Sequence, residues 1–337
     1  MNKEKTKISA QVVADSLSPQ GDRLTSLLIT FPRIILSELL THRMLSKNTS
    51  SSRAIPFNKM VEAVQKDPFI PIAWQKEHKG MQGTEYITDP LEIQFATSNW
   101  LTARKDAIRW AEALNGNNSY PSVTKQLCNR LLEPFMWTTM LITGSREGWN
   151  NFFHLRCPSY KLIGLDEENV KSRKEWLEKI QFSSALHPSM YPKTDVEWLQ
   201  INKGQAEIHM MMLSEKIYDE YQNSVPLQLK ENQWHIPMIS DLESLKLSTD
   251  DQIKLSVGRA ANTSYTVVGD GKELTLEHAI KIHDKCVELV HSSVFEHCAR
   301  AMSDEEYNKS FKGEEKGWFR NYKGFKSYRQ IIEENDK

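Results

Sequence analysis

Two strand-like segments near the start of the chain constrain its fold more than any other feature. ISAQVVADSL (8–17) and RLTSLLITF (23–31) are rich in apolar and β-branched residues, and SPQGD between them consists of turn formers. This pattern predicts an antiparallel hairpin, and MWTTMLIT (136–143) predicts a further strand. Because helical segments accompany these strands, we expect an α/β (α+β) fold in which an antiparallel-rich sheet is flanked by helices.

Helix start signals and hydrophobic spacing predict the helices. Pro32 precedes a helix-like stretch over 33–45, and Thr88-Asp89-Pro90 starts a long helix that runs to Gly116. Apolar residues at spacings of three and four predict an amphipathic helix over 204–221, with its methionines in the core. Its apolar face consists of Ala206, Met210, Leu213, Ile217 and Tyr221. Further helices are expected over 124–134, 146–156 and 274–290, and residues 57–87 are expected to be irregular.

Length and composition suit one globular domain. The 337 residues are 39% hydrophobic and 26% charged, so we expect a single domain over 1–337. Several prolines and a charged DEENVKSRKEWLEK helix indicate an insertion at 157–202. Residues 303–337 form a basic, aromatic tail.

Charge and hydropathy exclude some classes of protein. A net charge of −1 disfavours a general nucleic-acid binder, and no apolar run reaches the roughly 18 residues that a membrane span needs. The first ten residues lack the apolar core of a secretory signal. We therefore expect a cytoplasmic protein with no membrane partner, whose four cysteines are reduced.

The stretch THRMLSKNTSSSRAIP (41–56) combines hydroxyl groups with basic side chains. It could hold a phosphate, because arginine makes bidentate, charge-assisted bonds, or it could be a solvated basic face. Three arginines elsewhere lie near aromatic or polar turns: Arg130, Arg146 and Arg156.

Other catalytic patterns are weak. The histidines lack the HxxxH or cysteine-pair spacing of a metal site, so no metal is predicted, and His283 is expected to be a hydrogen-bonded core residue. His297 and Cys298 could form a nucleophile pair, but adjacent residues of a strand point to opposite faces. No GxSxG or SxxK motif accompanies the serines.

The basic stretch resembles the signature of the flavin-dependent thymidylate synthases. That signature reads Arg-His-Arg, seven residues, Ser, one residue and Arg, and His42, Arg43, Ser51 and Arg53 fall on it. Thr41 stands where the first arginine is usual, and Thr49 stands where a glutamate is usual.

Other segments resemble the same family. NFFHLR resembles its Asn-Phe-x-x-Leu-Arg segment, with Asn151 and Arg156, and NRLLEPFMW is loosely similar to its arginine helix, with Arg130. GQAEI is similar to its Ala-Gln-x-Glu-Ile helix. GRAANTSY and HSSVFEH (291–297) resemble segments that precede the arginine signature in the family and follow it here. We therefore expect a circular permutation in which 250–302 corresponds to the family's N-terminal segment.

The resemblance implies a function and a set of roles. Members are homotetramers of α/β subunits with FAD in shared active sites, and they convert dUMP to dTMP with methylenetetrahydrofolate as carbon source and NADPH as reductant. The implied FAD-binding residues are Thr41, His42, Arg43, Asn151 and His297. The implied dUMP-binding residues are Ser51, Arg53, Arg130 and Arg156. His297 and Arg156 would be catalytic, with an arginine stabilising charge on the activated uracil ring.

Two alternatives stay open. A related enzyme could transfer another one-carbon group, such as hydroxymethyl, to a pyrimidine nucleotide. A non-catalytic nucleotide- or RNA-binding protein could share the fold without the flavin, and the tail sequence WFRNYKGFKSYR favours this class because aromatic rings stack on bases.

Overall fold

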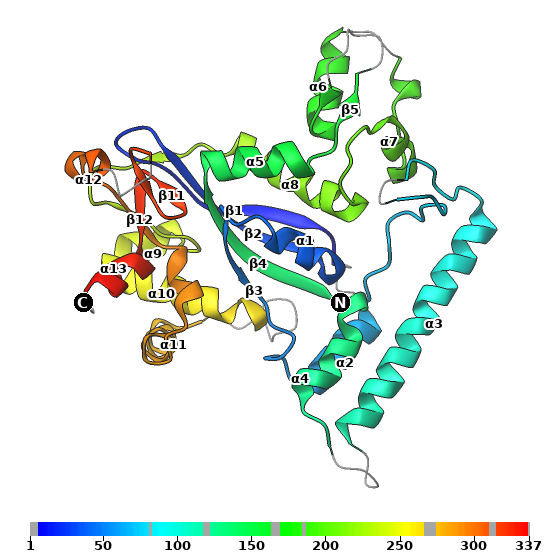
Figure 1. Cartoon of the computed structure of the whole chain (residues 1–337), viewed down its shortest axis with the longest axis horizontal. Coiled ribbons are helices and arrows are strands. Elements are labelled where there is room, and N and C mark those ends of the chain that lie inside the picture. Colours follow the sequence, from blue (N-terminus) through cyan, green and yellow to red (C-terminus); the bar gives the residue numbers. More distant parts are fainter. Residues whose placement is uncertain are drawn as a thin grey trace.

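The computed structural model describes residues 6–80, 83–116, 122–162, 169–183, 187–265, 274–309 and 315–335. A five-stranded sheet forms its centre, in the order β3-β4-β2-β1-β7, and all pairs are antiparallel except β1 with β7 (Figure 1). In sheet order the strands are β3 (Ser46–Thr49), β4 (Trp137–Ser145), β2 (Arg23–Pro32), β1 (Ser9–Leu17) and β7 (Leu227–Gln228). The predicted hairpin and the antiparallel-rich α/β class are confirmed.

Helices cover both faces of this sheet. On one face, α1 (Leu36–Leu40), α5 (Arg146–Arg156) and α8 (Ile208–Asn223) pack against Leu27, Ile29 and Ile142. On the other face, α10 (Thr249–Ala261), α11 (Leu276–Glu288) and the 3-10 helix η5 (Ser292–Glu296) gather around Leu141. Successive side chains of β4 alternate between the two faces, so Thr143 shares the face of Leu141.

Three predicted helices are confirmed with their physical basis. The long helix is α3 (Pro90–Asn115), and Asp89 caps it by accepting from the backbone N–H groups of Leu91 and Glu92. The predicted helix over 204–221 is α8, which begins later, at Ile208, so that Ala206 precedes it and is half-buried. The rest of the predicted apolar face is buried, and Met210 and Met211 are core residues. In α11, His283 is buried and hydrogen-bonded to Asp284 and Tyr328, as predicted.

Two local predictions were wrong. The helix after Pro32 is short, with a 3-10 turn η1 (Arg33–Ile35) and α1, and the polar residues 46–49 form β3 because β4 offers them a pairing edge. Residues 57–66, expected to be irregular, form α2 (Phe57–Lys66). Its buried residues Phe57, Met60, Val61 and Val64 carry a helical spacing that was overlooked.

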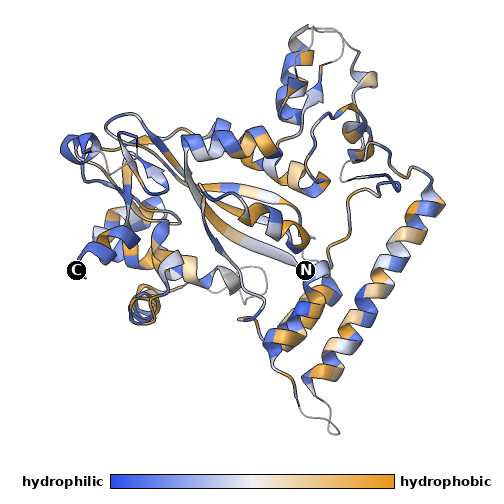
Figure 2. Ribbon diagram, viewed as in Figure 1, coloured by the Kyte–Doolittle hydropathy of each residue, from blue (hydrophilic) through white to orange (hydrophobic). Residues whose placement is uncertain are grey.

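Two parts project from the sheet. The helices α2 and α3, together with α4 (Lys125–Cys128) and the 3-10 helix η2 (Asn129–Phe135), form an arm whose α3 carries polar and apolar residues along its length (Figures 1 and 2). The proposed insertion has its own core around Trp176 and Trp198. It contains β5 (Tyr160–Lys161), β6 (Asn169–Val170), α6 (Arg173–Ser183), η3 (Pro188–Met190) and α7 (Asp195–Ile201). Of the segment predicted as a charged helix (166–179), residues 166–168 lie outside the described residues, 169–170 form β6, and the helix starts at Arg173.

The tail packs into the fold. Its strand β12 (Phe325–Ser327) joins a sheet of order β12-β9-β8, with β9 (Ala299–Ala301) and β8 (Trp234–His235), and Tyr322 and Phe325 are buried. The remaining elements of this region are α9 (Asp241–Lys246), η4 (Asn262–Tyr265), α12 (Asp304–Asn308), β10 (Trp318–Phe319), β11 (Tyr322–Lys323) and α13 (Tyr328–Asn335). Among the helices that the structure describes, none combines the length and apolar character required to cross a membrane.

Candidate functional site

The edge strand β3 organises the candidate site. It pairs with β4 on one side and spans about 10 Å at the usual rise of a strand. The signature residues lie before it, at 41–43, and after it, at 51–53. The turn before β3 packs closely on Gly148 of α5. A Cβ atom at Gly148 would lie only 3.2 Å from the carbonyl oxygen of Met44 in this turn. A larger residue there would push the signature turn away from α5.

His42 and Arg156 hold each other where α1 and α5 end. Arg156 Nε donates to His42 Nε2 at 2.9 Å, and its guanidinium also lies 3.6 Å from the Glu38 carboxylate and 3.5 Å from Thr41 Oγ1. Burial, and then the positive charges of Arg156 and Lys47, lower the pKa of His42 to about 4. His42 is therefore neutral at pH 7, with its proton on Nδ1, because Arg156 can only donate.

Lys47 holds the turn before β3 through backbone carbonyl groups. Its ammonium group donates to the carbonyl oxygens of His42 and Leu40. Burial lowers the pKa of Lys47 to about 8, and the nearby Glu296 carboxylate opposes that change. Glu296 in turn pairs with Arg329 of the tail. The Lys47 ammonium group thus fixes the turn that carries His42.

The residues after β3, which we call the serine loop (50–53), are joined to η2. Ser52 donates to Glu133 at 2.7 Å, and Asn129 donates to the carbonyl oxygens of Ser52 and Ile55 at 2.7 and 3.0 Å. Ser50 shares a hydrogen bond of 2.7 Å with Thr138 of β4. The loop is therefore fixed on three sides although its residues lie far from η2 in the sequence.

Basic side chains outnumber acids around the serine loop. Arg33 pairs with Glu133 at 3.1 Å, and Arg130 lies 3.8 Å from the same carboxylate. Lys125 donates to the carbonyl oxygen of Ala54, and Arg53 is exposed on the loop itself. Two arginines thus share the Glu133 carboxylate, and Lys125 and Arg53 add two more cationic side chains on or beside the loop, which leaves positive charge for an anion.

The other predicted residues lie in different places. Thr41 and Arg43 are exposed beside His42, and Ser51 is half-buried in the serine loop. Asn151 is exposed on the solvent side of α5, one turn from the exposed Leu155, whereas Arg156 turns towards His42. The structure therefore brings together Thr41, His42 and Arg156, and it joins the serine loop, which carries Ser51 and Arg53, to η2, which carries Arg130.

His297 lies on the opposite face of the sheet from His42. Its Nδ1 is 2.8 Å from Thr143 Oγ1, whereas His42 packs its ring edge on Phe152 in the other core. It is almost completely buried, and its Nε2 has no hydrogen-bond partner in the part of the chain that the structure describes. Burial, with a smaller effect from His235, lowers the pKa of His297 to about 3.

The Cys298 thiol does not suit a nucleophile. It is buried, it donates to Ser256 Oγ at 3.3 Å, and burial raises its pKa to about 12. A thiol in this state holds its proton at pH 7. Within the described residues, no cluster of three or more His, Cys, Asp or Glu side chains could hold a metal ion.

Sequence reasoning missed four residues that shape the site: Arg33, Lys47, Glu133 and Thr143. All of them except Lys47 contact a partner that is distant in the sequence. A lysine five residues after His42 was visible in the signature stretch, but its bond to the His42 carbonyl depends on the turn.

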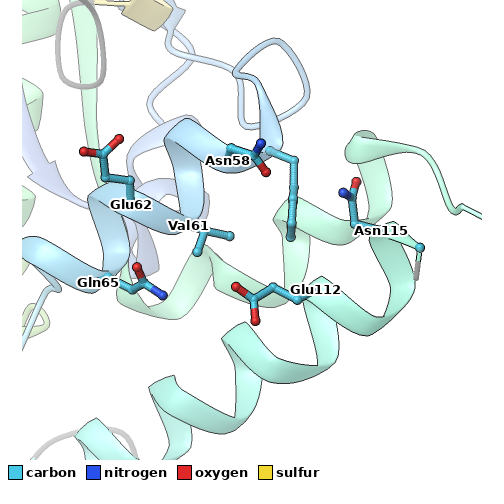
Figure 3. Close-up of a pocket in the computed structure, with 8 residues that line it drawn as sticks. Asn58, Val61, Glu62, Gln65, Glu112 and Asn115 are labelled. Atoms are coloured by element: carbon cyan, nitrogen blue, oxygen red, sulfur yellow. The ribbon is translucent and has the colours of Figure 1, made fainter. Parts of the chain in front are cut away.

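A hollow of about 330 Å³ lies away from these residues, between α2 and α3 (Figure 3). Polar side chains from both helices line it, among them Asn58 and Glu62 of α2 and Glu112 of α3. None of the predicted site residues lines it, so it gives no support to their assignment.

No protein-family model matches the sequence, and the comparison with curated proteins finds no match. The chain is similar to a solved structure of the UMP/dUMP methylase PolB from Streptomyces cacaoi bound with 5-Br dUMP, at 13% identity and a TM-score of 0.37. That similarity covers 54% of this chain and 90% of PolB. It is also similar to the flavin-dependent thymidylate synthase ThyX from Helicobacter pylori complexed with FAD and dUMP. There the identity is 13%, the TM-score is 0.26, and 50% of this chain and 69% of ThyX are covered.

Proposed function

We propose that this chain is an FAD-dependent thymidylate synthase that binds dUMP at the serine loop and converts it to dTMP. The observation that carries the proposal is the surplus of basic side chains around the hydroxyl groups of this loop, at one end of β3. The arginine–histidine pair of the same signature lies at the other end of this short strand.

A nucleotide phosphate suits the serine loop. A phosphate monoester carries nearly two negative charges near pH 7, and arginine binds it through charge-assisted hydrogen bonds. Glu133 is already paired with Arg33, so Arg53 and Arg130 retain their positive charge for the ligand. Ser51 supplies a hydroxyl group for binding. The proposed dUMP ligands are therefore Ser51, Arg53 and Arg130, with Arg156 directed to the base.

The turn before β3 fits a flavin in its chemistry. Thr41 and Arg43 offer an exposed hydroxyl group and an exposed cation, and the apolar side chains of Leu40 and Met44 are exposed beside them. A flavin dinucleotide combines a large ring system with a charged diphosphate, so it needs both kinds of surface. When bound, FAD would supply the electron transfer, with NADPH as its reductant and methylenetetrahydrofolate as the carbon source. Thr41, His42 and Arg43 would hold it.

Arg156 and His42 would act through their charge and their fixed form. Burial is the main cause of the neutral state of His42, and the charge of Arg156 adds to it. Arg156 also orients the His42 ring, and the part of its guanidinium not used by His42 remains beside Thr41. A cation at this position would stabilise negative charge on a uracil carbonyl oxygen.

Asn151 and His297 require a different explanation within the proposal. Asn151 faces solvent on α5, so we propose that it completes the FAD site of another copy in a homotetramer with shared active sites. His297 lies behind β3, so we propose that it organises the site through Thr143. The circular permutation and the insertion at 157–202 are part of the same proposal.

The test of dUMP binding uses two charge deletions and a matched control. Arg53→Ala and Arg130→Ala each remove a proposed phosphate ligand, and Arg109→Ala removes an exposed, Asp106-paired arginine on α3. A charge-assisted hydrogen bond contributes about 1.5–3 kcal/mol, so calorimetry should show dUMP binding weakened by roughly 10- to 150-fold in the first two variants only. Equal affinity in all three variants would reject the phosphate site.

The two alternatives give different results. A hydroxymethyl transferase would bind dUMP and FAD in the same way, but its product would contain one more oxygen atom than dTMP, which mass spectrometry detects.

For an RNA-binding protein, the basic aromatic tail should face solvent with free cations. In the structure Arg320, Lys323, Lys326 and Arg329 are paired with acids of the same chain, and Tyr322 and Phe325 are buried. Ion pairs and packing within the chain thus account for the basic, aromatic composition of the tail, which had favoured an RNA-binding protein.

A further inference from the structure

The long helix α3 exposes large apolar side chains on the side that faces away from the arm. Its other side packs into the core of the arm through four residues: Trp100, Ala107, Ile108 and Ala111. On the outer side, Leu91 and Phe95 are 75% and 72% exposed, and Trp110 and Leu114 are 59% and 42% exposed. We call these four side chains the α3 stripe. In the part of the chain whose side chains the structure describes, no other phenylalanine or tryptophan is exposed to this degree.

The α3 stripe has a two-fold pattern. Leu91 and Leu114 lie equally far from the midpoint between Thr102 and Ala103, and Phe95 and Trp110 do so as well. In a two-fold symmetric interface, residue i of one copy contacts residue j of the other, and j contacts i. Two antiparallel α3 helices would therefore place leucine on leucine and phenylalanine on tryptophan, twice each. No large apolar side chain of the stripe would be left without a counterpart.

The spacing within α3 suits a crossed pair of helices. Rows of residues four apart run along its outer side, at 91, 95 and 99 and at 102, 106, 110 and 114. Rows of this kind interdigitate when two helix axes cross at about −50°, the commonest angle in globular proteins. At the crossing point the small side chains of Thr102 and Ala103 allow a close approach. Away from it the axes diverge, and the large side chains at 95 and 110 fill the space.

Polar and charged side chains favour the antiparallel direction. Residues 91–102 contain one charged side chain, Glu92, whereas residues 103–114 contain three basic and two acidic side chains, so the two halves carry net charges of −1 and +1. An antiparallel pair brings unlike halves together and opposes the two helix dipoles, whereas a parallel pair brings like charges together. It also places the Asn99 amide, a donor, opposite the Asp106 carboxylate of the second copy.

The α3 stripe is large enough to matter for assembly. A phenylalanine or tryptophan can bury about 150–250 Å², so at the exposed fractions above the stripes of two copies supply roughly half of the about 1,600 Å² that a stable interface buries. The polar side chains between the two rows supply further area. The helix is about 39 Å long, so the whole stripe fits within one pair of helices.

We propose that α3 is an interface between two copies of this chain, in which two α3 helices pack antiparallel about a two-fold axis at Thr102 and Ala103. Figure 1 shows α3 at the outer edge of the arm, where a second copy can approach it. This surface is distinct from the one around Asn151 of α5, at which the proposed function places another copy. The α3 interface does not depend on that function, because neither the serine loop nor the turn before β3 belongs to α3.

The experiment uses single cysteines in the full-length protein, whose own four cysteines are buried. Thr102→Cys places a thiol at the two-fold axis, next to the same thiol of the second copy. Ala113→Cys is the matched control at another exposed position of α3, where the two thiols of an antiparallel pair would lie about 31 Å apart along the helices. Mild oxidation at micromolar concentration should link Thr102→Cys into a dimer on a non-reducing gel and leave Ala113→Cys monomeric. No dimer in Thr102→Cys, or equal linkage in both variants, would overturn the proposal.

Sedimentation of cysteine-unmodified protein provides a second test. Phe95→Asp and Trp110→Asp should each halve the mass of the wild-type assembly, and unchanged far-UV circular dichroism should show that the variants are folded. Leu245→Asp, at a position of α9 that is 84% exposed, is the control and should retain the wild-type mass. A monomeric wild-type protein at micromolar concentration, or a Phe95→Asp variant with the wild-type mass, would overturn the proposal. Failure of the serine-loop variants to affect dUMP binding would reject the proposed function and leave these results unchanged.

Discussion

Acidification from pH 7 to pH 5 should destabilise this protein strongly through three buried histidines. The pKa values of His42 and His235 are lowered to about 4, and that of His297 to about 3, from an ordinary value of 6.5. As the pH falls below 6.5, the unfolded chain binds protons at these positions and the native state does not. The free energy of unfolding therefore decreases with falling pH until the folded pKa values are reached.

The magnitude follows from the cited pKa values. Between pH 7 and pH 5 each of the three histidines should remove about 2 kcal/mol from the free energy of unfolding, and together they should remove about 5–6 kcal/mol. This is a large part of the roughly 5–15 kcal/mol that stabilises a typical domain. Burial raises the pKa of Glu215 and Asp219, and their uptake of protons in the native state opposes the loss. A comparison of variants cancels that contribution.

The assay is reversible urea unfolding, followed by tryptophan fluorescence, at both pH values. His235→Gln keeps a polar group but removes the titration, so its loss of stability between pH 7 and pH 5 should be smaller than that of the wild type by about 2 kcal/mol. His278→Gln, at an exposed position on α11, is the control and should behave as the wild type. If His235→Gln loses as much stability as the wild type over this interval, the explanation from buried neutral histidines is wrong.

Three further predictions concern single contacts. Arg156→Met should raise the pKa of His42, but not to 6.5 because burial is the larger cause, and an NMR titration of the His42 ring protons checks this. Arg173 of the insertion pairs with the buried Glu215 of α8, so Arg173→Met should leave that carboxylate without its cation. The free energy of unfolding in urea should fall by about 3–5 kcal/mol. A loss below about 1 kcal/mol would show that this pair does not fix the insertion to α8. Tyr322→Phe removes the bond to the Glu296 carbonyl oxygen and should cost about 1 kcal/mol, whereas an unchanged midpoint would show that the tail does not stabilise this segment.

Local signals in the sequence predicted the elements that depend on neighbouring residues. The hairpin followed from its turn residues, α3 followed from the cap at Asp89, and α8 followed from its apolar spacing. β3 could not be predicted in the same way, because a short polar segment becomes a strand only when an edge such as that of β4 is available. The overlooked α2 was different, since its apolar spacing was present in the sequence.

The candidate site was predictable in residue type and only partly in position. From its composition the signature stretch could either bind an anion or be a solvated basic face, and the structure gathers basic side chains around its serines. The pairing of His42 with Arg156 and of Thr143 with His297 joins residues more than 100 positions apart, which no local pattern encodes. For the same reason the sequence could not show that His297 and His42 lie on opposite faces of the sheet.

The most direct measurement is the visible absorption spectrum of the purified protein with added FAD, recorded before and after dUMP. A flavin in the turn before β3, next to dUMP at the serine loop, should give a bound-flavin spectrum that shifts when dUMP is added. Arg53→Ala should retain the flavin spectrum and lose the shift at the same dUMP concentration. A protein that binds no flavin with FAD in excess would contradict the proposed synthase.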